Sequence, residues 1–230
     1  MLLFAACATN NTSNDQPADR GPLGKADASG SCANSDCAGQ APGGNCYCDV
    51  DCVMYGDCCS DQLLTCEPAT AAELSTMNAT ELDELFARGA LPVVADLAGE
   101  LAGSSLANAV VPLPGPIQDA INLIANKTWL GKTLTPTTTT TATGFNRVQI
   151  GTELQIAYFN AALGAGRDGN GSLHLDYNVE QNPIGVNAIR DEVRQVGDGV
   201  YLGKAFLHTA VGEPALFFFS LQPTSAPILE

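Results

Sequence analysis

Two histidines and an aspartate in the C-terminal half of the chain have the side chains best suited to acid–base or metal chemistry. His174 and Asp176 are two positions apart, so they lie on one face of an expected strand, and His208 belongs to a second expected strand. Together with Tyr177, these groups can transfer protons or bind a metal ion. The spacing does not require this, because the same face can simply be turned to solvent.

Charged residues of alternating sign follow closely, in Arg190, Asp191, Glu192 and Arg194. If this cluster lines a pocket, the planar guanidinium of Arg190 can hold a carboxylate or a phosphate. The alternative, which we favour, is a network of salt bridges that closes one end of a β-barrel.

Other types of site find little support. The turn at 168–172 has the spacing Asp-x-Asn-x-Ser, but the glycine and the last glutamate of a calcium loop are misplaced, so we predict a hairpin turn. The sequence has neither a glycine-flanked serine nucleophile nor a phosphate-binding glycine loop. We therefore expect no metal and no cofactor, and we favour a binding role over an enzymatic one.

Eight of the nine cysteines lie within the segment from Cys32 to Cys66, and the ninth is Cys7. A segment this short cannot bury enough apolar surface to fold by itself, so it needs disulfides, which persist outside the reducing cytosol. A zinc site is the rival interpretation, but the adjacent pair Cys58-Cys59 and the lack of histidine in the segment argue against it. The spacing alone leaves the pairing open.

The cysteine pattern resembles the somatomedin B domain over residues 32–66. The resemblance is carried by Cys46-Tyr47-Cys48-Asp49, by Cys52, by Asp57-Cys58-Cys59-Ser60-Asp61 and by Cys66. It implies a disulfide-rich knot with the pairs Cys32–Cys48, Cys37–Cys66, Cys46–Cys59 and Cys52–Cys58.

The same resemblance implies a protein-binding face at Asp49, Met54 and Tyr55. The chain departs from the family at Asp51, where an apolar residue is expected, and at Met54, where an aromatic residue is expected. Residues 32–66 contain no Lys or Arg, so we expect a partner with a basic surface. The alternative is that the knot is only a spacer or a stabilising cap.

The N-terminal sequence Ala5-Ala6-Cys7 resembles the lipobox of bacterial lipoproteins, which implies lipidation of Cys7. We interpret residues 1–7 as the remnant of a signal peptide whose start lies upstream, since the apolar stub is short and lacks a basic residue. Residues 8–31 are polar and predict a disordered tether. The expected location is the bacterial outer membrane or cell surface, or the outside of the cell after secretion.

The composition limits the partners. The 230-residue chain has a net charge of −15, which disfavours binding to nucleic acid because phosphate backbones would be repelled. No apolar stretch approaches the roughly 20 residues that span a bilayer, so contact with a membrane is expected only through the lipid anchor.

The second domain is expected at 78–222, after a linker at 67–77 and before a tail at 223–230. Its N-terminal part predicts short helices, one from Asn78 to Gly89 and another with Ile117, Ile121 and Ile124 on one face, while 92–108 suits a helix or a strand. The rest predicts strands, with a threonine-rich loop or edge at 136–143 and a short helix near 186–192. The expected strands are 128–134, 149–163, 173–177, 200–207 and 215–221.

This part of the chain resembles an uncharacterised lipocalin-like or calycin-like bacterial domain, which implies an antiparallel β-barrel. The resemblance includes Trp129-Leu130-Gly131-Lys132, the phrase Ile189-Arg190-Asp191-Glu192-Val193-Arg194, and Gly199-Val200-Tyr201-Leu202-Gly203. It implies that Trp129 plugs one end of the barrel, which encloses a small apolar ligand or a filled core. The expected ligand-binding residues are Trp129, Tyr177, Arg190 and Phe218, with Phe217, Phe219, Leu154, Ile156, Tyr158 and Leu173 as further lining.

Three hypotheses follow. The first is an anchored binding protein with a recognition knot and a ligand-binding barrel. The second is an exported enzyme that uses Asp176, Arg190 or His174 in the barrel. The third is a structural surface protein without a ligand.

Overall fold

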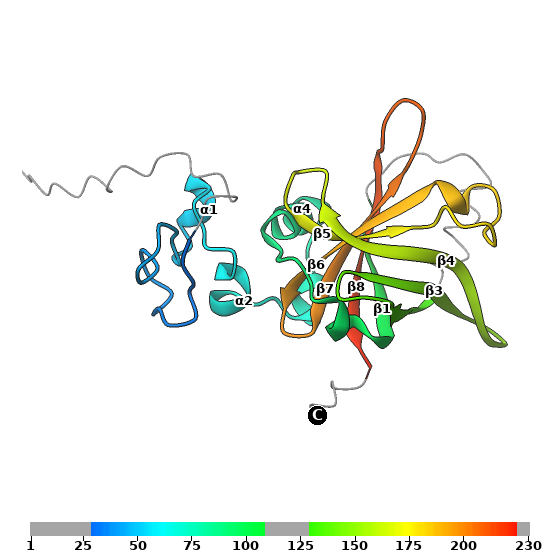
Figure 1. Cartoon of the computed structure of the whole chain (residues 1–230), viewed down its shortest axis with the longest axis horizontal. Helices are drawn as coiled ribbons and strands as arrows, with labels where there is room; N and C mark the ends of the chain where they lie inside the picture. The colour runs from blue at the N-terminus through cyan, green and yellow to red at the C-terminus, as the bar shows by residue number, and fades with distance from the viewer. Residues whose placement is uncertain (1–28, 109–128, 225–230) are drawn as a thin grey trace, which may run out of the picture.

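The computed structural model describes residues 29–108 and 129–224. Figure 1 shows a cysteine-rich knot followed by a β-barrel. Cys7, most of the expected tether, the expected helix around Ile117–Ile124 and most of the expected tail lie outside the described residues. No helix in the described part is long and apolar enough to cross a membrane.

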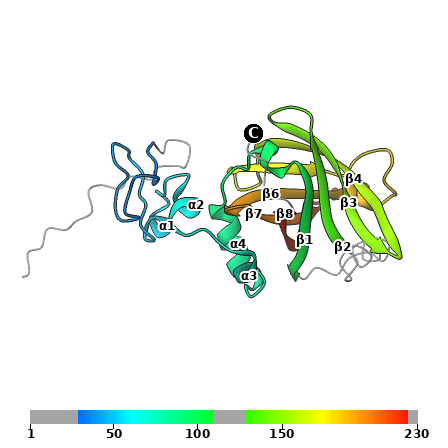
Figure 2. The ribbon, with the colours of Figure 1, turned by 90° about the horizontal axis from the view of Figure 1, so that it is seen from below.

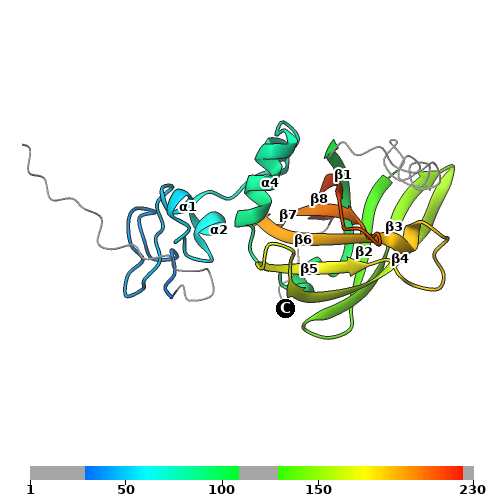
Figure 3. The ribbon, with the colours of Figure 1, turned by 90° about the horizontal axis from the view of Figure 1, so that it is seen from above.

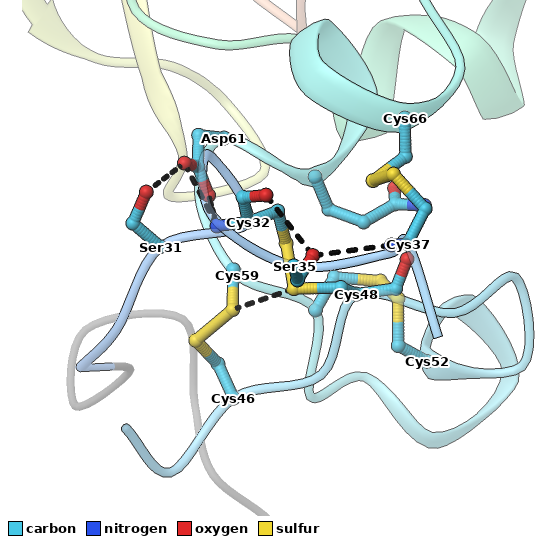
Figure 4. The surroundings of a disulfide bond; sticks show 12 residues. Ser31, Cys32, Ser35, Cys37, Cys46, Cys48, Cys52, Cys59, Asp61 and Cys66 are labelled. Carbon is cyan, nitrogen blue, oxygen red and sulfur yellow. Dashed lines mark hydrogen bonds between the residues drawn. A yellow bond between two sulfur atoms is a disulfide. The ribbon is translucent and has the colours of Figure 1, made fainter. Parts of the chain in front are cut away.

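The knot is built around sulfur and has two short helices, α1 (Cys52–Tyr55) and α2 (Gln62–Cys66). The Asp61 carboxylate accepts hydrogen bonds from the backbone N–H of Cys32 and from the Ser31 hydroxyl, which ties the start of the knot to its end (Figure 4). The disulfides are the pairs that the resemblance implies: Cys32–Cys48, Cys37–Cys66, Cys46–Cys59 and Cys52–Cys58.

The segment expected to be a linker is packed against the barrel. It contains α3 (Ala71–Leu74), and the backbone N–H of Ala69 donates to the carbonyl oxygen of Val196. The next helix, α4 (Ala79–Arg88), begins at a capping box in which the Asn78 side chain accepts from the N–H of Glu81. Figure 2 shows α3 and α4 between the knot and the barrel.

Eight antiparallel strands form a closed barrel in sequence order, in which β1 also pairs with β8. The fold class expected for this domain is therefore confirmed. The knot lies beyond one end of the barrel, and the β3–β4 hairpin reaches toward the other (Figure 3). The strands are β1 (Gly99–Asn108), β2 (Trp129–Pro136), β3 (Thr141–Ile150), β4 (Thr152–Ala165), β5 (Gly171–Asp176), β6 (Ile189–Gly197), β7 (Val200–Leu207) and β8 (Ala215–Pro223).

Residues 92–108, expected to be a helix or a strand, form a short 3-10 helix, η2 (Val94–Leu97), and then strand β1. The long strand expected at 149–163 is β4, but it begins only at Thr152, because Gly151, at a positive φ of 71°, makes the turn between β3 and β4. The helix expected at 186–192 is only η3 (Val186–Ala188), because pairing with β5 and β7 draws the following residues into β6.

Two apolar cores result from the alternation of side chains along the strands. One fills the barrel interior and includes Phe159, Leu175 and Phe219. The other lies between the helices and the outer face of the barrel, and it includes Leu63 of the knot as well as Phe218 of β8. The knot, the helices and the barrel are thus joined by one continuous apolar contact.

Candidate functional site

The barrel interior holds a buried polar cluster. Lys132 Nζ on β2 donates to Asn146 Oδ1 on β3 at 2.9 Å, to the Tyr177 hydroxyl at 2.5 Å and to Asp191 Oδ2 on β6 at 3.2 Å. The Tyr177 hydroxyl in turn donates to Asp191 Oδ2 at 2.8 Å. Lys132 and Asp191 are each about 3% exposed, so this is an ion pair removed from water.

Asn146 connects the cluster to the barrel wall. Its Oδ1 also accepts from Trp129 Nε1 at 3.1 Å, and its Nδ2 donates to the carbonyl oxygen of Ala157 at 3.1 Å. Ala157 has a φ of 49°, a left-handed conformation that is strained for a residue other than glycine, and it lies at a register shift between β3 and β4. The strained backbone thus serves to orient the side chain of Asn146.

A second register shift brings Trp129 and Lys132 to the same side of β2. An odd and an even position of a regular strand face opposite sides, but the pairing of β2 with β3 shifts between Trp129 and Gly131. Gly131 is required there, because its φ is 127° and a Cβ would lie 1.9 Å from the carbonyl oxygen of Leu101.

Aromatic rings surround the ammonium group of Lys132. The distances from Nζ to the ring centroids are 4.8 Å for Phe219, 5.3 Å for Tyr177, 5.5 Å for Phe159 and 5.6 Å for Trp129. Rings at such distances attract a cation through their quadrupoles, which offsets part of the cost of burying it.

Burial governs the protonation of the cluster. It lowers the pKa of Lys132 and raises the pKa of Asp191, while the attraction between the two charges opposes both shifts. Burial, reinforced by the nearby Asp191 carboxylate, raises the pKa of Tyr177 well above its usual value, so this hydroxyl stays protonated. The Lys132–Asp191 pair is net neutral whichever of the two groups holds the shared proton.

A partly open cavity of about 30 Å³ lies beside this cluster, and residues of the cluster line it. Its wall runs from the exposed Ser105 on β1, past the half-buried Phe217, to the buried Asp191. The volume suffices for one or two groups the size of a water molecule. Asp191 Oδ1 is buried and accepts no hydrogen bond from any described residue. The remaining lining residues are Trp129, Lys132, Asn146, Ala157, Tyr177, Ile189 and Phe219.

Of the four predicted ligand-binding residues, Trp129 and Tyr177 line this cavity, whereas Arg190 and Phe218 do not. Phe218 packs against the helices, because its neighbours Phe217 and Phe219 occupy the inward positions of β8. Of the further lining residues expected, Leu154 and Tyr158 are exposed. Ile156 and Leu173 belong to the interior core without lining the cavity.

Arg190 lies on the outer face because Asp191, the next residue, faces inward. Its guanidinium donates to the backbone carbonyl oxygens of Asn187 and Ile189 and lies 3.2 Å from the carboxylate of Asp176. Arg190 therefore cannot stand at the mouth of the interior cavity.

Both histidines line a second, open groove of about 310 Å³, together with Arg190 and Asp191. His174 Nε2 contacts the carbonyl oxygen of Ala165 at 3.0 Å, and His208 Nδ1 contacts the Glu213 carboxylate at 2.5 Å. Asp176 and Tyr177 do not line this groove. Within 29–108 and 129–224, the one group of three potential metal ligands consists of disulfide sulfurs.

Arg194 lies on the outer face of β6 and joins it to α4 and to the turn between β4 and β5. It is fully buried and donates to the Asp168 carboxylate, to the Ser172 hydroxyl and to the carbonyl oxygen of Phe86 on α4. The segment from Asp168 to Ser172 is the turn between β4 and β5, as expected. Arg194 thus belongs to a network of polar contacts on the outer wall of the barrel, not at one of its ends, whereas Asp191 of the same charged run faces the interior.

The predicted binding face of the knot contains exposed apolar side chains. Met54 is 74% exposed and Tyr55 is 49% exposed. Asp49 lies beside them, and one of its carboxylate oxygens accepts from the N–H of Cys52 at the start of α1.

Lys132 and Asn146 were not among the residues expected at a site. Lys132 is two positions from the buried Leu134 on β2, so both side chains point to the same face. Asn146 is likewise two positions from the buried Gly144 and Val148 on β3. A single polar residue among apolar residues on the inward face of a strand is the sequence signal that could have identified Lys132 and Asn146 as site residues.

The sequence matches no protein-family model, and no curated protein matches it. Among solved structures, a protein from Thermomonospora curvata is similar, with 17% sequence identity and a TM-score of 0.43. The match covers 67% of this chain and 93% of that chain. These comparisons do not confirm the somatomedin B or the lipocalin resemblance, so the function has to be inferred from the geometry.

Proposed function

We propose that this chain is an exported binding protein whose barrel takes a small, mainly apolar ligand into its interior. The supporting observation is the partly open cavity inside the barrel, which is lined mainly by apolar and aromatic side chains and by the buried Lys132–Asp191 pair. Apolar walls with a few placed polar groups are typical of ligand sites. The disulfides indicate an oxidising environment, and Ala5-Ala6-Cys7 supports a lipid anchor on Cys7.

The barrel proposal is tested by fluorescence, because Trp129 is the single tryptophan and lines the cavity. Titration of the oxidised full chain with small neutral apolar molecules should change the emission saturably. Ser105→Phe should block the mouth and weaken binding at least tenfold, whereas the matched control Ser104→Phe, at a position that does not line the cavity, should bind normally. A response that never saturates, or equal binding by both variants, would overturn the proposal.

A second proposal concerns the knot, which we suggest docks a protein with a basic rim. Its support is the exposed apolar group of Val50, Val53, Met54 and Tyr55, in a segment without Lys or Arg. A clustered apolar patch on a rigid scaffold loses little entropy when a partner binds.

Site-specific photocrosslinking on the assembled cell envelope tests the second proposal. A crosslinker at position 54 should join the chain to a defined protein, and the yield should fall as salt is raised. The same crosslinker at the exposed Ala33 is the control. Equal products from both positions would contradict a docking face at α1.

A further inference from the structure

Three of the described strand connections lie together at one end of the barrel. The strands are antiparallel and follow one another in sequence order, so the connections β3–β4, β5–β6 and β7–β8 share an end. The knot lies beyond the opposite end (Figure 3), where Ala69 donates to the carbonyl oxygen of Val196 beside the β6–β7 turn. We call the tips of the three connections, residues 149–152, 181–188 and 209–212, the distal rim.

Each tip of the distal rim exposes a large aliphatic side chain. Ile150 is 46% exposed, Ile184 is 94% exposed and Val211 is 97% exposed. A single exposed aliphatic residue needs no explanation, but several at one end of a molecule indicate a surface for binding. The distal rim therefore carries apolar area that the fold itself does not use.

Local hydrogen bonds hold two of these tips in place. Next to Ile184, the Asn182 side chain accepts from the backbone N–H of Tyr158 and donates to the carbonyl oxygens of Tyr158 and Tyr177. In the β7–β8 turn, the hydroxyl of Thr209 donates to the carbonyl oxygen of Gly212 and accepts from the N–H of Val211. The aliphatic side chains are thus presented by ordered turns.

The distal rim is also free of charge, although the chain as a whole has a net charge of −15. None of the residues in its three tips is Asp, Glu, Lys or Arg, and the nearest acids along the chain, Glu153, Glu180 and Glu213, lie outside the tips. At the opposite end, the connections include Arg167, Asp168 and Asp198. The distal rim consequently suits a partner surface that is apolar and carries no net charge, since charges are costly to bring into such a surface.

The interior cavity lies in the half of the barrel next to the distal rim. Its lining residues Trp129 and Ile189 are the first residues of β2 and β6, and Phe217 is near the start of β8. Ser105 is near the end of β1. All four strand ends point toward the distal rim, because antiparallel strands alternate in direction.

We propose that the distal rim docks on a lipid surface without net charge, with Ile150, Ile184 and Val211 inserted at the boundary between head groups and acyl chains. Separate apolar tips can each enter a deformable lipid layer, whereas a protein partner would need a matching pocket for each tip. This inference goes beyond the proposed ligand-binding function, and it places the cavity end of the barrel against an apolar phase.

Flotation with phosphatidylcholine vesicles tests the proposal. The oxidised full chain carries Cys7→Ser, so that no acyl chain on this residue can contribute, and lipid is supplied at millimolar concentration because a few aliphatic side chains bind weakly. The chain should float with the vesicles. Replacing part of the phosphatidylcholine by anionic phosphatidylglycerol should weaken binding, because the protein is strongly acidic.

Ile184→Asp/Val211→Asp should lower the partition into vesicles roughly tenfold or more, since it removes apolar area and adds two charges. The matched control is Leu91→Asp/Val93→Asp, which adds the same charge at two exposed aliphatic residues, of which Leu91 lies next to Gly171 at the opposite end. The control should bind vesicles nearly as well as the parent chain. Circular dichroism checks the fold of each variant.

Insertion is measured directly with a tryptophan at the tip, which keeps the test decisive if an Asp variant does not fold. In Ile184→Trp, lipids brominated in their acyl chains should quench the added emission, whereas in Val93→Trp they should not. Trp129 is present in both variants, so the difference reports the added residue.

The contrary outcomes are distinct. Absence of vesicle binding, binding that requires anionic lipid, or equal binding by the two double Asp variants would overturn the proposal. Self-association that Ile184→Asp/Val211→Asp abolishes, without vesicle binding, would overturn it in favour of an interface between copies of the chain. Ser105→Phe should still bind vesicles, so loss of ligand binding by the barrel and loss of lipid docking can be told apart.

Discussion

At the scale of single residues, the interior of this barrel combines an ion pair with aromatic walls. Lys132 and Asp191 are both buried and bonded to each other, and Tyr177 hydrogen-bonds to both. Asn146 accepts from Lys132 and from the indole N–H of Trp129. Buried charges are costly unless they are paired, and removal of one partner leaves the other uncompensated. The cluster therefore holds the cavity in one geometry only as long as it remains complete.

This coupling predicts a specific pattern of stabilities. Lys132→Met should destabilise the fold by about 3–5 kcal/mol, because Asp191 remains buried without its cation. The double variant Lys132→Met/Asp191→Leu should recover most of that loss, since no uncompensated charge is left. Urea unfolding measures both values, and two small, additive effects would contradict the role assigned to the pair.

A second ion pair, outside the cavity, makes stability depend on pH. The pKa of Asp168 lies well below its usual value near 3.8, mainly because Arg194 donates hydrogen bonds to the carboxylate. A group whose folded pKa is depressed stabilises the fold above its unfolded pKa, and this contribution is lost as pH falls through the folded pKa. Stability should thus decline below about pH 4.

The comparison that isolates this effect is Asp168→Asn. The variant should be less stable than the unaltered protein at pH 7, and the difference should shrink as the pH is lowered from 4 to 2. Thermal unfolding across this range measures it. A difference that stays constant with pH would mean that the Asp168 charge does not contribute.

At the scale of elements, two glycines, each opposite an aromatic residue of the adjacent strand, allow aromatic rings to cover the cluster. Gly203 on β7 is paired with Phe219 on β8, and Gly144 on β3 is paired with Phe159 on β4. A Cβ at Gly203 would lie 2.1 Å from the Phe219 ring, and one at Gly144 would lie 2.5 Å from the Phe159 ring. The rings of Phe219 and Phe159 therefore pack on the backbone of the two glycines, where no side chain is in the way. In this position both rings lie close to the ammonium group of Lys132.

Gly203→Ala should therefore displace Phe219. We expect a loss of about 1–3 kcal/mol, the usual cost of overpacking, and a shift of the Trp129 emission, since the two rings meet edge to face at 5.8 Å. Gly164→Ala, at an exposed position of β4 next to the flexible side chain of His174, is the control and should change neither quantity. An unchanged Trp129 emission in Gly203→Ala would contradict this role for the glycine.

At the scale of the whole molecule, the knot is attached to the barrel by packing as well as by the chain. Leu63 of α2 is 3% exposed and belongs to the apolar core shared by the helices and the outer barrel face. Arg88 at the end of α4 forms an ion pair with Glu67 and a hydrogen bond with Gln62. These contacts hold the knot against the helices and the outer face of the barrel.

Leu63→Asp should break this attachment while the disulfides keep the knot folded. Nitrogen-15 relaxation should then show faster tumbling of residues 32–60 than of the barrel, whereas in the unaltered protein both parts tumble together. Thr65→Asp, at an exposed position of the same helix, is the control. Independent tumbling already in the unaltered protein would contradict the fixed attachment.

Much of the architecture could be predicted from local patterns. Cysteine spacing indicates a disulfide-rich knot, because so short a segment has no other source of stability. Alternation along β5 places Leu173, Leu175 and Tyr177 on one face and His174 on the other, as observed. The capping box at Asn78 marks the start of α4. Each of these features depends on residues that are close in sequence.

The interior site depended on tertiary structure. Lys132, Asn146 and Asp191 come from three different strands. Asn146 also donates to the carbonyl oxygen of Ala157, whose left-handed backbone conformation could not be predicted from the sequence. In the run Arg190-Asp191-Glu192, alternation shows that Arg190 and Asp191 face opposite sides but not which of them faces inward. Closure of the barrel decides this, because the register of β6 against β5 and β7 turns Asp191 inward and leaves Arg190 outside.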